Sequence, residues 1–488
     1  MKKYLVIALA ALFVLGFAAS SFAIHAEIPA ETQAVVAQSA TQITIGGELR
    51  VRGIYQENTT DFNSKATSST GDAAKYDERV RLQVEAKVTP NTTGLIQLEA
   101  GADTGVSQDL STWGPSLSGA TGTLPFSNQK QNSMKVLQAW ILHQGSGLLS
   151  VPALVKVGHM PIQIGMYGLF YEHTKFGDDA ILLGVDPIKG MHLILGTVKL
   201  YEGQLGLNDD VTAYTFIGTY DPNKDTSVGL DVTYADGQNL LQNTILGFTP
   251  TFGGRVNDTD LHLWNFAVHG KTRVAGLGIA GELDVQSVKW DDLAPASLPV
   301  RQQDDKYTTM AAKVDFDYKI NPVTLMLRGA YGSGNNNVTG LGIKKDFVTS
   351  QSFLQHDTFV YEYLTMNAAG NFNGGGLQNT MYLKAAASAD ITKDLDGTLS
   401  AYYLRAINSY QKEFNAIGNN INSKSIGTEV DWIVNYKIDR NLKYYVEGGY
   451  LFAGNFWRGV TPTTDALGLN HKNPDDAWAI RHGIQLSF

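Results

Sequence analysis

Apolar and polar residues alternate with a period of two along most of the chain from Thr41 to Phe488. In "QITIGGELRVRGIYQE", one set of alternate positions is mainly apolar, and the other carries Glu48, Arg50 and Arg52. The stretches "DERVRLQVEAKVT" and "AAKVDFDYKI" repeat this pattern, whereas helical periodicity is nearly absent. Such alternation predicts β-strands with one apolar face and one charged face.

The alternating runs are long, at about ten to seventeen residues. Strands of soluble sandwiches average about five or six residues, whereas about 9 to 11 are needed to cross a bilayer. In lipid every backbone polar group needs a partner, so a membrane-spanning sheet must close on itself. The sequence therefore predicts an all-β fold, a transmembrane antiparallel β-barrel spanning residues 41–488.

The connections between the runs alternate in length. Short connections made of turn-forming residues lie at 89–93, 186–190, 221–225, 270–273, 320–322, 392–396 and 439–441. Long polar connections lie at 58–76, 104–132, 238–259, 290–306, 334–378, 409–424 and 454–476. This alternation predicts short periplasmic turns, long extracellular loops and about eighteen strands, with sixteen as the alternative count. Residues 356–365 alternate like a strand, but a strand there would break the even count, so we assign them to a long loop.

The N-terminal residues have the pattern of a secretory signal peptide. Lys2 and Lys3 precede an apolar run, and small residues end it at Ala23. We expect residues 1–23 to be cleaved during export. Residues 24–40 are predicted to be a periplasmic lead with a faint helical pattern, and the sequence does not show whether this lead or loop 334–378 plugs the lumen.

Charge and cysteine content narrow the function classes. Without Lys2 and Lys3, 36 basic side chains remain against 47 acidic ones, a formal charge of −11, which argues against nucleic acid as a partner. The chain has no cysteine, which excludes disulfides, thiolate catalysis, iron-sulfur clusters and covalent c-type haem.

No motif in the chain predicts an enzyme. Residues 276–281 match G-x-G-x-x-G, but the run continues as a strand with its glycines expected on the inner face, whereas a dinucleotide site needs a helix there. The histidines lack the spacing of a helical zinc pair, and no G-x-S-x-G is present. We expect no catalytic, cofactor or metal site.

The polar faces of the strands carry many charges of both signs. Isolated dry ions cost several kcal/mol each, so these charges require a wet interior, which a barrel of about eighteen strands is wide enough to provide. The residues predicted to line the pore are Arg50, Arg52, Arg79, Arg81, Lys87, Glu48, Glu85, Lys313, Asp315, Asp317, Arg328 and Arg481.

Two features concern the first and last strands. Arg50, Arg52, Arg79 and Arg81 form a basic group that either attracts anions at a constriction or pairs across strands and stiffens the wall. The chain ends in "WAIRHGIQLSF", whose alternate apolar residues end at Phe488. We expect this strand to close the barrel against the first one, with His482 as an unexplained break in the lipid-facing set.

Several stretches resemble the alginate-export type of outer-membrane porin. They are "GGELRVRGIYQEN", "YDERVRLQVEAKV", "LVKVGHMPIQIG", "FGDDAILL" and "RGAYGSGN". The resemblance implies an eighteen-stranded channel in a Gram-negative outer membrane, and the terminal Phe488 resembles the insertion signal read by the outer-membrane assembly machinery. The family often has Gly-Arg-Gln where this chain has Gly158-His159-Met160, so we expect one lumen arginine to be missing. Taken over all inward positions of the clearest strands, a wider set than the twelve residues named above, we expect 11 basic and 11 acidic residues, so alginate is not carried over as the solute.

The leading hypothesis is a porin for passive diffusion of small hydrophilic solutes, with anions as one candidate class. The alternative is a scaffold that sheathes a partner, such as a multihaem cytochrome in a transmembrane electron conduit. Expected partners are outer-membrane lipid, the assembly machinery and the solute. A homotrimer and a monomer are both compatible with the sequence, which leaves solute, pore width and selectivity open.

Overall fold

The structure is a computed structural model of the 488-residue chain. It describes residues 34–38, 41–60, 62–64, 72–101, 134–146, 151–175, 177–202, 210–240, 259–292, 305–334, 346–351, 357–364, 377–408, 423–459 and 473–488. The predicted signal peptide, residues 1–23, lies outside the described residues, as does most of the predicted lead at 24–40.

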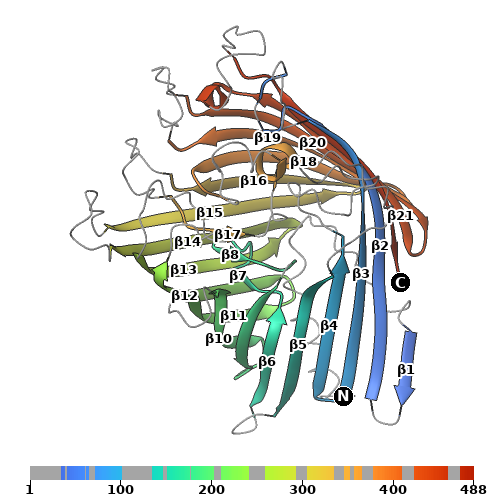
Figure 1. The fold of residues 1–488 in the computed structure, drawn as a ribbon, viewed down its shortest axis with the longest axis vertical. Coiled ribbons are helices and arrows are strands. Elements are labelled where there is room, and N and C mark those ends of the chain that lie inside the picture. The colour runs from blue at the N-terminus through green and yellow to red at the C-terminus, as the bar shows by residue number, and fades with distance from the viewer. Residues whose placement is uncertain are drawn as a thin grey trace, which may run out of the picture.

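Eighteen antiparallel strands form one closed barrel, which confirms the predicted fold and strand count. Figure 1 shows the strands following one another around the wall in chain order. They are β2 (Thr41–Glu57), β3 (Ala73–Thr89), β4 (Thr92–Ala100), β5 (Lys135–Ser146), β6 (Pro152–Met160), β9 (Asp178–Val185), β10 (Met191–Tyr201), β11 (Val211–Asn223), β12 (Thr226–Leu240), β13 (Thr259–Val274), β14 (Leu277–Asp292), β15 (Asp305–Ile320), β16 (Val323–Gly332), β18 (Thr380–Thr392), β19 (Leu395–Ala406), β20 (Ser425–Asp439), β21 (Leu442–Ala453) and β22 (Ala477–Ser487).

The last strand closes the barrel against the first. β22 pairs with β2 in a register that sets Gln485 opposite Arg50. Phe488 continues this pairing, because its amide donates to the Gly47 carbonyl at 3.0 Å and its carbonyl accepts from the Gly47 amide at 2.8 Å. The pairing of β2 with β22 begins at Glu48, and the earlier residues 41–45 of β2 pair with β1 (Ala34–Gln38). This part of the lead is therefore a strand, and the faint helical pattern predicted the wrong structure for it.

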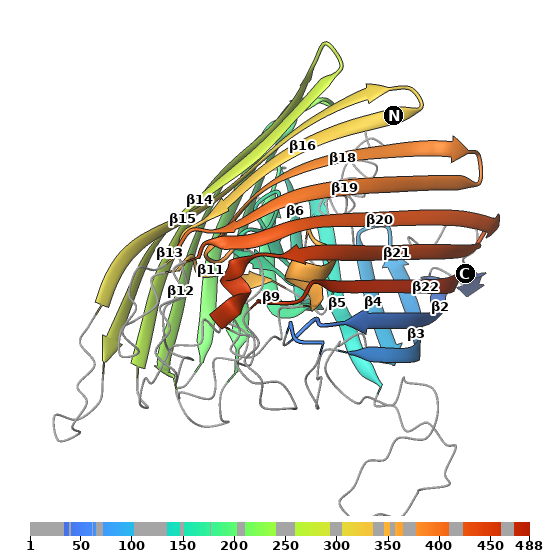
Figure 2. The ribbon, with the colours of Figure 1, turned by 90° about the horizontal axis from the view of Figure 1, so that it is seen from above.

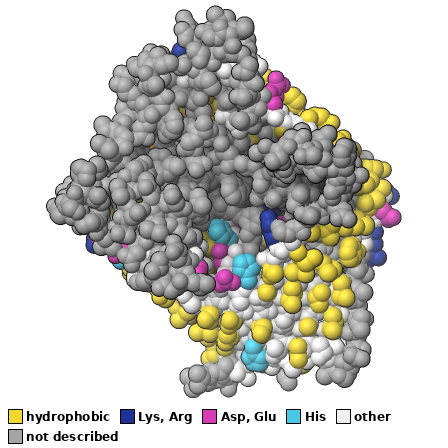
Figure 3. Space-filling view, viewed as in Figure 1, with side chains coloured by type: hydrophobic (Ala, Val, Ile, Leu, Met, Phe, Trp, Pro, Cys, Tyr) yellow, Lys and Arg dark blue, Asp and Glu magenta, His cyan; other side chains and the backbone are white. Residues whose placement is uncertain are grey.

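The two faces of the wall differ as the period of two predicts. On β14, Glu282 and Asp284 are 3% and 0% exposed, whereas Leu283 between them is 43% exposed. Successive side chains of a strand point to opposite faces, so the charged set points inward and the apolar set outward. In Figure 3 hydrophobic side chains cover much of the lower right surface, where Figure 1 places β3 to β5.

Strand ends that lead into short turns and strand ends that lead into long connections lie at opposite ends of the barrel, as predicted. One turn is displaced: the β13–β14 hairpin turns at Ala275 and Gly276, which have φ values of 51° and 85°, and not at 270–273. Both residues need positive φ in a two-residue hairpin turn. The strand extends through the predicted turn, so Gly276 lies in the turn, Gly278 on the inner face and Gly281 on the outer face. The expectation that all of these glycines face inward was therefore wrong.

Several connections enter the barrel. The β6–β9 connection carries β7 (Gln163–Ile164) and β8 (Tyr171–Glu172), which form a small sheet with β17 (Ser350–Gln351). A π-helical turn, η3 (Phe359–Leu364), lies inside the curve of strands β18 to β22 in Figure 2, and a 3-10 turn, η5 (Asn455–Gly459), follows β21. Residues 357–364 are thus loop and not strand, as we expected for 356–365. Within the described residues, no helix has the length and apolarity needed to cross a membrane.

Candidate functional site in the barrel interior

Wall carboxylates hold the β6–β9 connection through its backbone amides. Glu282 on β14 accepts hydrogen bonds from the amides of Tyr167 at 2.5 Å and Leu169 at 3.3 Å. Asp231 on β12 accepts the Gly165 amide at 2.8 Å. Buried backbone amides need acceptors, and the wall carboxylates supply them, so these contacts anchor the connection to β12 and β14.

Residues 346–351 lie against the same part of the wall. Gln286 on β14 donates to the Val348 carbonyl at 2.7 Å and accepts the Val348 amide at 2.9 Å. The Thr349 hydroxyl donates to the Leu169 carbonyl at 2.8 Å. The two inserted regions are therefore bonded to each other as well as to β14.

Residues 357–364, which we call the inserted segment, are held on the other side of the barrel. Asp431 on β20 accepts the Phe359 amide at 3.0 Å, and Glu429 accepts the amides of Val360 at 2.5 Å and Tyr361 at 2.9 Å. These are the amides that the start of a helical turn leaves without intrahelical partners. The wall thus supplies the cap of η3.

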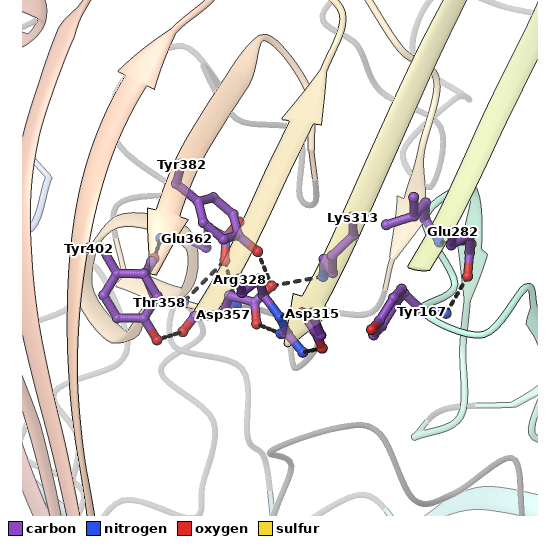
Figure 4. Close-up of polar contacts among 11 residues, drawn as sticks. Tyr167, Glu282, Lys313, Asp315, Arg328, Asp357, Thr358, Glu362, Tyr382 and Tyr402 are labelled. Carbon is purple, nitrogen blue, oxygen red and sulfur yellow. Dashed lines mark hydrogen bonds and ion pairs between the residues drawn. The ribbon is translucent and has the colours of Figure 1, made fainter. Parts of the chain in front are cut away.

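Asp357 is the hub of the inserted segment. Its carboxylate accepts from Lys313 Nζ at 2.7 Å and also from Arg328 Nη1 and the Tyr382 hydroxyl, while its carbonyl accepts from the Tyr402 hydroxyl. These four partners come from β15, β16, β18 and β19. Figure 4 shows them converging on Asp357, and we call this group the Asp357 cluster.

The Asp357 cluster includes two further carboxyl groups. Asp315 on β15 accepts two hydrogen bonds from the Arg328 guanidinium, at 2.6 Å and 2.5 Å. Glu362 folds back to accept the amides of Asp357 at 2.5 Å and Thr358 at 3.1 Å. Arg328 is therefore shared between a wall carboxylate and an inserted one.

The two carboxyl groups of the inserted segment have opposite pKa shifts. Burial by itself raises the pKa of the Asp357 carboxyl, but the charges of Arg328 and Lys313 hold it well below its usual range. Burial also raises the pKa of the Glu362 carboxyl, and the charge of Asp357 beside it adds to this effect, which places the pKa at about 7. Asp357 is thus a fixed negative charge at neutral pH, whereas Glu362 titrates there.

The basic group predicted from the first strands is paired with wall carboxylates. Arg52 Nε lies 2.9 Å from Asp77, Arg79 Nη2 lies 2.5 Å from Glu48, and Arg81 Nε lies 2.8 Å from Glu99. Arg50 Nη2 lies 3.9 Å from Asp77. We call these four arginines and three carboxylates the arginine network. Its formal charge is +1, far below the +4 of an unpaired group.

The other predicted pore-lining residues lie on the same inner face. Arg481 on β22 donates to Glu447 on β21 and lies over the Phe359 ring, with its Cζ 4.8 Å from the ring centroid. Asp317 accepts from Arg273 at 2.6 Å near the β13–β14 turn. Glu85 and Lys87 are half-buried near the rim of short turns. The structure thus brings Lys313, Asp315 and Arg328 together and leaves Glu85, Lys87 and Asp317 apart from them.

Two histidines differ from expectation. His159 pairs with Asp179 at 3.1 Å and shares the outer face with Val157, so an arginine at this position would not reach the lumen, contrary to the expectation. His482 on the outer face has its Nδ1 3.2 Å from the Tyr444 hydroxyl, and its ring meets that of Tyr76 edge-on at 5.8 Å. The break in the lipid-facing pattern is thus part of an aromatic cluster.

Sequence reasoning missed the residues that enter the lumen from the connections, above all Asp357, Glu362 and Tyr167. One signal was present in the strands. Glu282 and Asp284, and likewise Glu429 and Asp431, are carboxylates two residues apart on one inner face, and like charges so placed require donors. The donors turn out to be amides of inserted residues, together with the Asn265 side chain, which donates to Asp284 at 3.0 Å.

A metal site in a protein needs several ligands close together, such as His, Cys, Asp or Glu side chains. Within the described residues, no three such side chains are grouped so that they could hold a metal ion. The absence of catalytic, cofactor and metal sites from the whole protein stays a prediction.

Comparisons with known proteins show the fold. The outer membrane protein opdK from Pseudomonas aeruginosa is 12% identical, with 91% of this chain and 98% of that chain covered and a TM-score of 0.50. For OprD from Pseudomonas aeruginosa the identity is 10%, the coverage 91% and 95%, and the TM-score 0.51. A BenF-like porin from Pseudomonas fluorescens Pf-5 is 11% identical, with 91% of this chain and 99% of that chain covered and a TM-score of 0.50. At this identity the likeness shows the barrel architecture alone. No family model and no curated protein matches the chain, so the resemblance to alginate-export porins stays a prediction.

Proposed function

We propose that the protein is an outer-membrane channel for the passive diffusion of small hydrophilic solutes. The observation that carries this proposal is the contrast between the faces of a closed barrel: apolar outside, and inside lined by charges such as those of the arginine network and the Asp357 cluster. Even paired ions cost several kcal/mol each when they are removed from water, so charges in this number favour a wet interior, and an eighteen-stranded barrel has room for water. The solved porins with the same fold support the proposal.

The outer face supports a membrane location. Exposed aromatic side chains lie toward both ends of the barrel wall, as in the aromatic girdles of outer-membrane barrels. Tyr214, Trp264 and Tyr403 lie toward the end with long connections, and Tyr220, Tyr318 and Tyr436 toward the end with short turns. We propose that these rows mark the two lipid interfaces, that the signal peptide directs export, and that Phe488 serves as the insertion signal.

The inserted regions favour a channel over a sheath. A scaffold for a cytochrome would keep its interior for the partner, but here wall side chains such as Glu282 and Glu429 bind the protein's own connections. Co-purification with a haem protein, together with poor conductance of the intact complex, would support the scaffold instead. The resemblance to alginate-export porins supports transport and is not extended to alginate. A catalytic function is not part of this proposal.

The proposal extends to a modest preference for anions, because the arginine network is positive by one charge. Replacing Arg50, Arg52, Arg79 and Arg81 by Ser should shift permeability toward cations. The matched variant replaces Glu48, Asp77 and Glu99 by their amides and should shift it toward anions. Liposome swelling with charged and neutral sugars measures both. If both variants and the wild-type protein take up all solutes equally, the arginine network does not determine selectivity. If the folded wild-type protein takes up no solute, the proposed channel function is wrong.

A further inference from the structure

We propose that Asp357 is a latch that fixes the inserted segment against the inner wall of the barrel and sets the local charge that a solute meets there. The inference rests on the proposed channel function and adds a specificity-determining residue to it. It arises from the position of one buried side chain that joins a connection to four consecutive wall strands.

The ion pairs of Asp357 differ from those of the arginine network in the part of the molecule that supplies the acid. In the arginine network each ion pair joins one wall strand to another, for example β2 to β3 through Arg79 and Glu48. At Asp357 the basic partners, Lys313 and Arg328, belong to the wall, whereas the acid belongs to the inserted segment. Removing the carboxylate therefore takes away the ion pairs that tie the segment to β15 and β16 and leaves the wall strands joined to each other.

The remaining ties of the inserted segment depend on its position. The amides of Phe359, Val360 and Tyr361 reach Asp431 and Glu429 on β20 only while the turn lies against that strand. Glu362 binds amides of its own segment, so it stabilises the turn without anchoring it to the wall. Asp357 and the β20 carboxylates thus hold the first half of the segment from different wall strands.

Docking also changes the local charge. The wall contributes three cations, Lys313, Arg328 and Lys384, against one carboxylate, Asp315, a formal charge of +2. Asp357 lowers this to +1, and Glu362 lowers it further when ionised. The wall beside Asp357 is therefore nearly neutral when the segment is docked and basic when it is not, whereas undocking also frees the carboxylates of Glu429 and Asp431 on β20.

The first test is single-channel recording of Asp357→Asn in planar bilayers under a salt gradient. Losing one partner of a buried ion pair should lower the ratio of docked to undocked segment by roughly two to four orders of magnitude. We expect larger and more variable conductance and a reversal potential shifted toward anions. The matched control is Asp317→Asn, which removes a carboxylate from the same inner face of β15 but leaves the inserted segment untouched.

The second test locks the segment in place. The chain has no cysteine, and a Cβ added at Gly449 would lie 3.2 Å from the Cβ of Phe359, a few tenths of an ångström short of the separation in a disulfide, about 3.5 to 4.5 Å. The added Cβ would also lie 2.4 Å from Asp431 Oδ1 and 3.0 Å from Val360 Cγ2, so these two side chains must shift to accept it. The double variant Phe359→Cys and Gly449→Cys should therefore form a reducible bridge, with Phe359→Cys alone as its control.

Combining the two changes separates the latch from a simple charge effect. If Asp357→Asn acts by releasing the segment, the oxidised bridge should cancel its conductance increase and a reductant should restore it. An equal increase with and without the bridge overturns the latch, as does an Asp357→Asn channel that behaves like wild type and Asp317→Asn. Heat-modifiable electrophoretic mobility checks that each variant is folded. Absence of conductance in every folded protein, wild type included, overturns the channel itself and is distinguishable from these outcomes.

Discussion

The arginine network and the Asp357 cluster use similar residues in different ways. In the arginine network both members of each ion pair lie on neighbouring strands, where hydrogen bonds of the ladder already fix their separation. In the Asp357 cluster the carboxylate comes from a connection that the ladder does not hold. Wall-to-wall pairs therefore stabilise the barrel, whereas under the proposed latch wall-to-segment pairs couple the charge of the lumen to the docking of the segment.

The largest expected effect is on barrel stability and belongs to the arginine network. Arg79→Met leaves the Glu48 carboxylate without its 2.5 Å partner, and breaking a buried pair in this way costs about 3 to 5 kcal/mol. The urea midpoint followed by tryptophan fluorescence should fall, and adding Glu48→Gln should recover part of the loss. Lys313→Met should change the channel conductance strongly and the urea midpoint little. A larger fall of the urea midpoint for Lys313→Met than for Arg79→Met would contradict this distinction between the two groups.

A smaller effect is expected at the β20 anchor. Glu429→Gln replaces a charged acceptor by a neutral one, and hydrogen bonds to charged groups contribute about 1.5 to 3 kcal/mol, against about 1 for neutral ones. The bridge between Phe359→Cys and Gly449→Cys should then form more slowly, while the urea midpoint changes little. Glu85→Gln on β3 is the control. Unchanged bridge formation would mean that Glu429 does not hold the segment.

The smallest effect is a pH dependence of the docked segment. Glu362 faces Asp357, Lys313, Tyr361 and Tyr382, and its pKa is raised to about 7 from 4.5. A raised pKa means that docking is favoured while Glu362 is protonated, so this contribution is complete below about pH 4.5 and is lost as pH rises through about 7.

Asp357, which also faces Arg328, Lys384 and Tyr402, has a lowered pKa and stays ionised throughout this window. The β20 carboxylates face the segment as amide acceptors. Conductance should therefore be larger at about pH 8 than at about pH 5, and Glu362→Gln should remove the difference. A Glu362→Gln channel that keeps the full wild-type pH dependence would assign it to other groups.

The fold could be predicted from the sequence because the alternation of apolar and polar residues is a local property of each strand. Each strand needs only its own alternation to reveal both its length and its inner face, so β2 begins at Thr41, where the alternation begins, and ends at Glu57, just before the long connection predicted at 58–76. The β13–β14 turn was misplaced because "GKTR" and Ala275-Gly276 both contain turn formers, and strand pairing decides between them. Alternation gives no information on such a choice.

The candidate site was predictable only in part. The alternation of faces along each strand places Lys313, Asp315 and Arg328 on the inner face. It does not identify their partner Asp357, which belongs to a connection and lies 29 residues beyond Arg328 in the sequence. Asp357 lies in "HDTFVYEYLT", whose alternation is strand-like although the chain forms a π-helical turn there. The amides of that turn are satisfied by Glu429 and Asp431, and this tertiary contact overrides the local pattern.

The most direct test is single-channel recording in planar bilayers of the purified wild-type protein and of the Phe359→Cys and Gly449→Cys double variant, oxidised and reduced. We predict ohmic steps from both proteins, with the fluctuations of the double variant suppressed by the oxidised bridge and restored on reduction. Silent bilayers at every voltage, or steps that ignore the bridge, would contradict it.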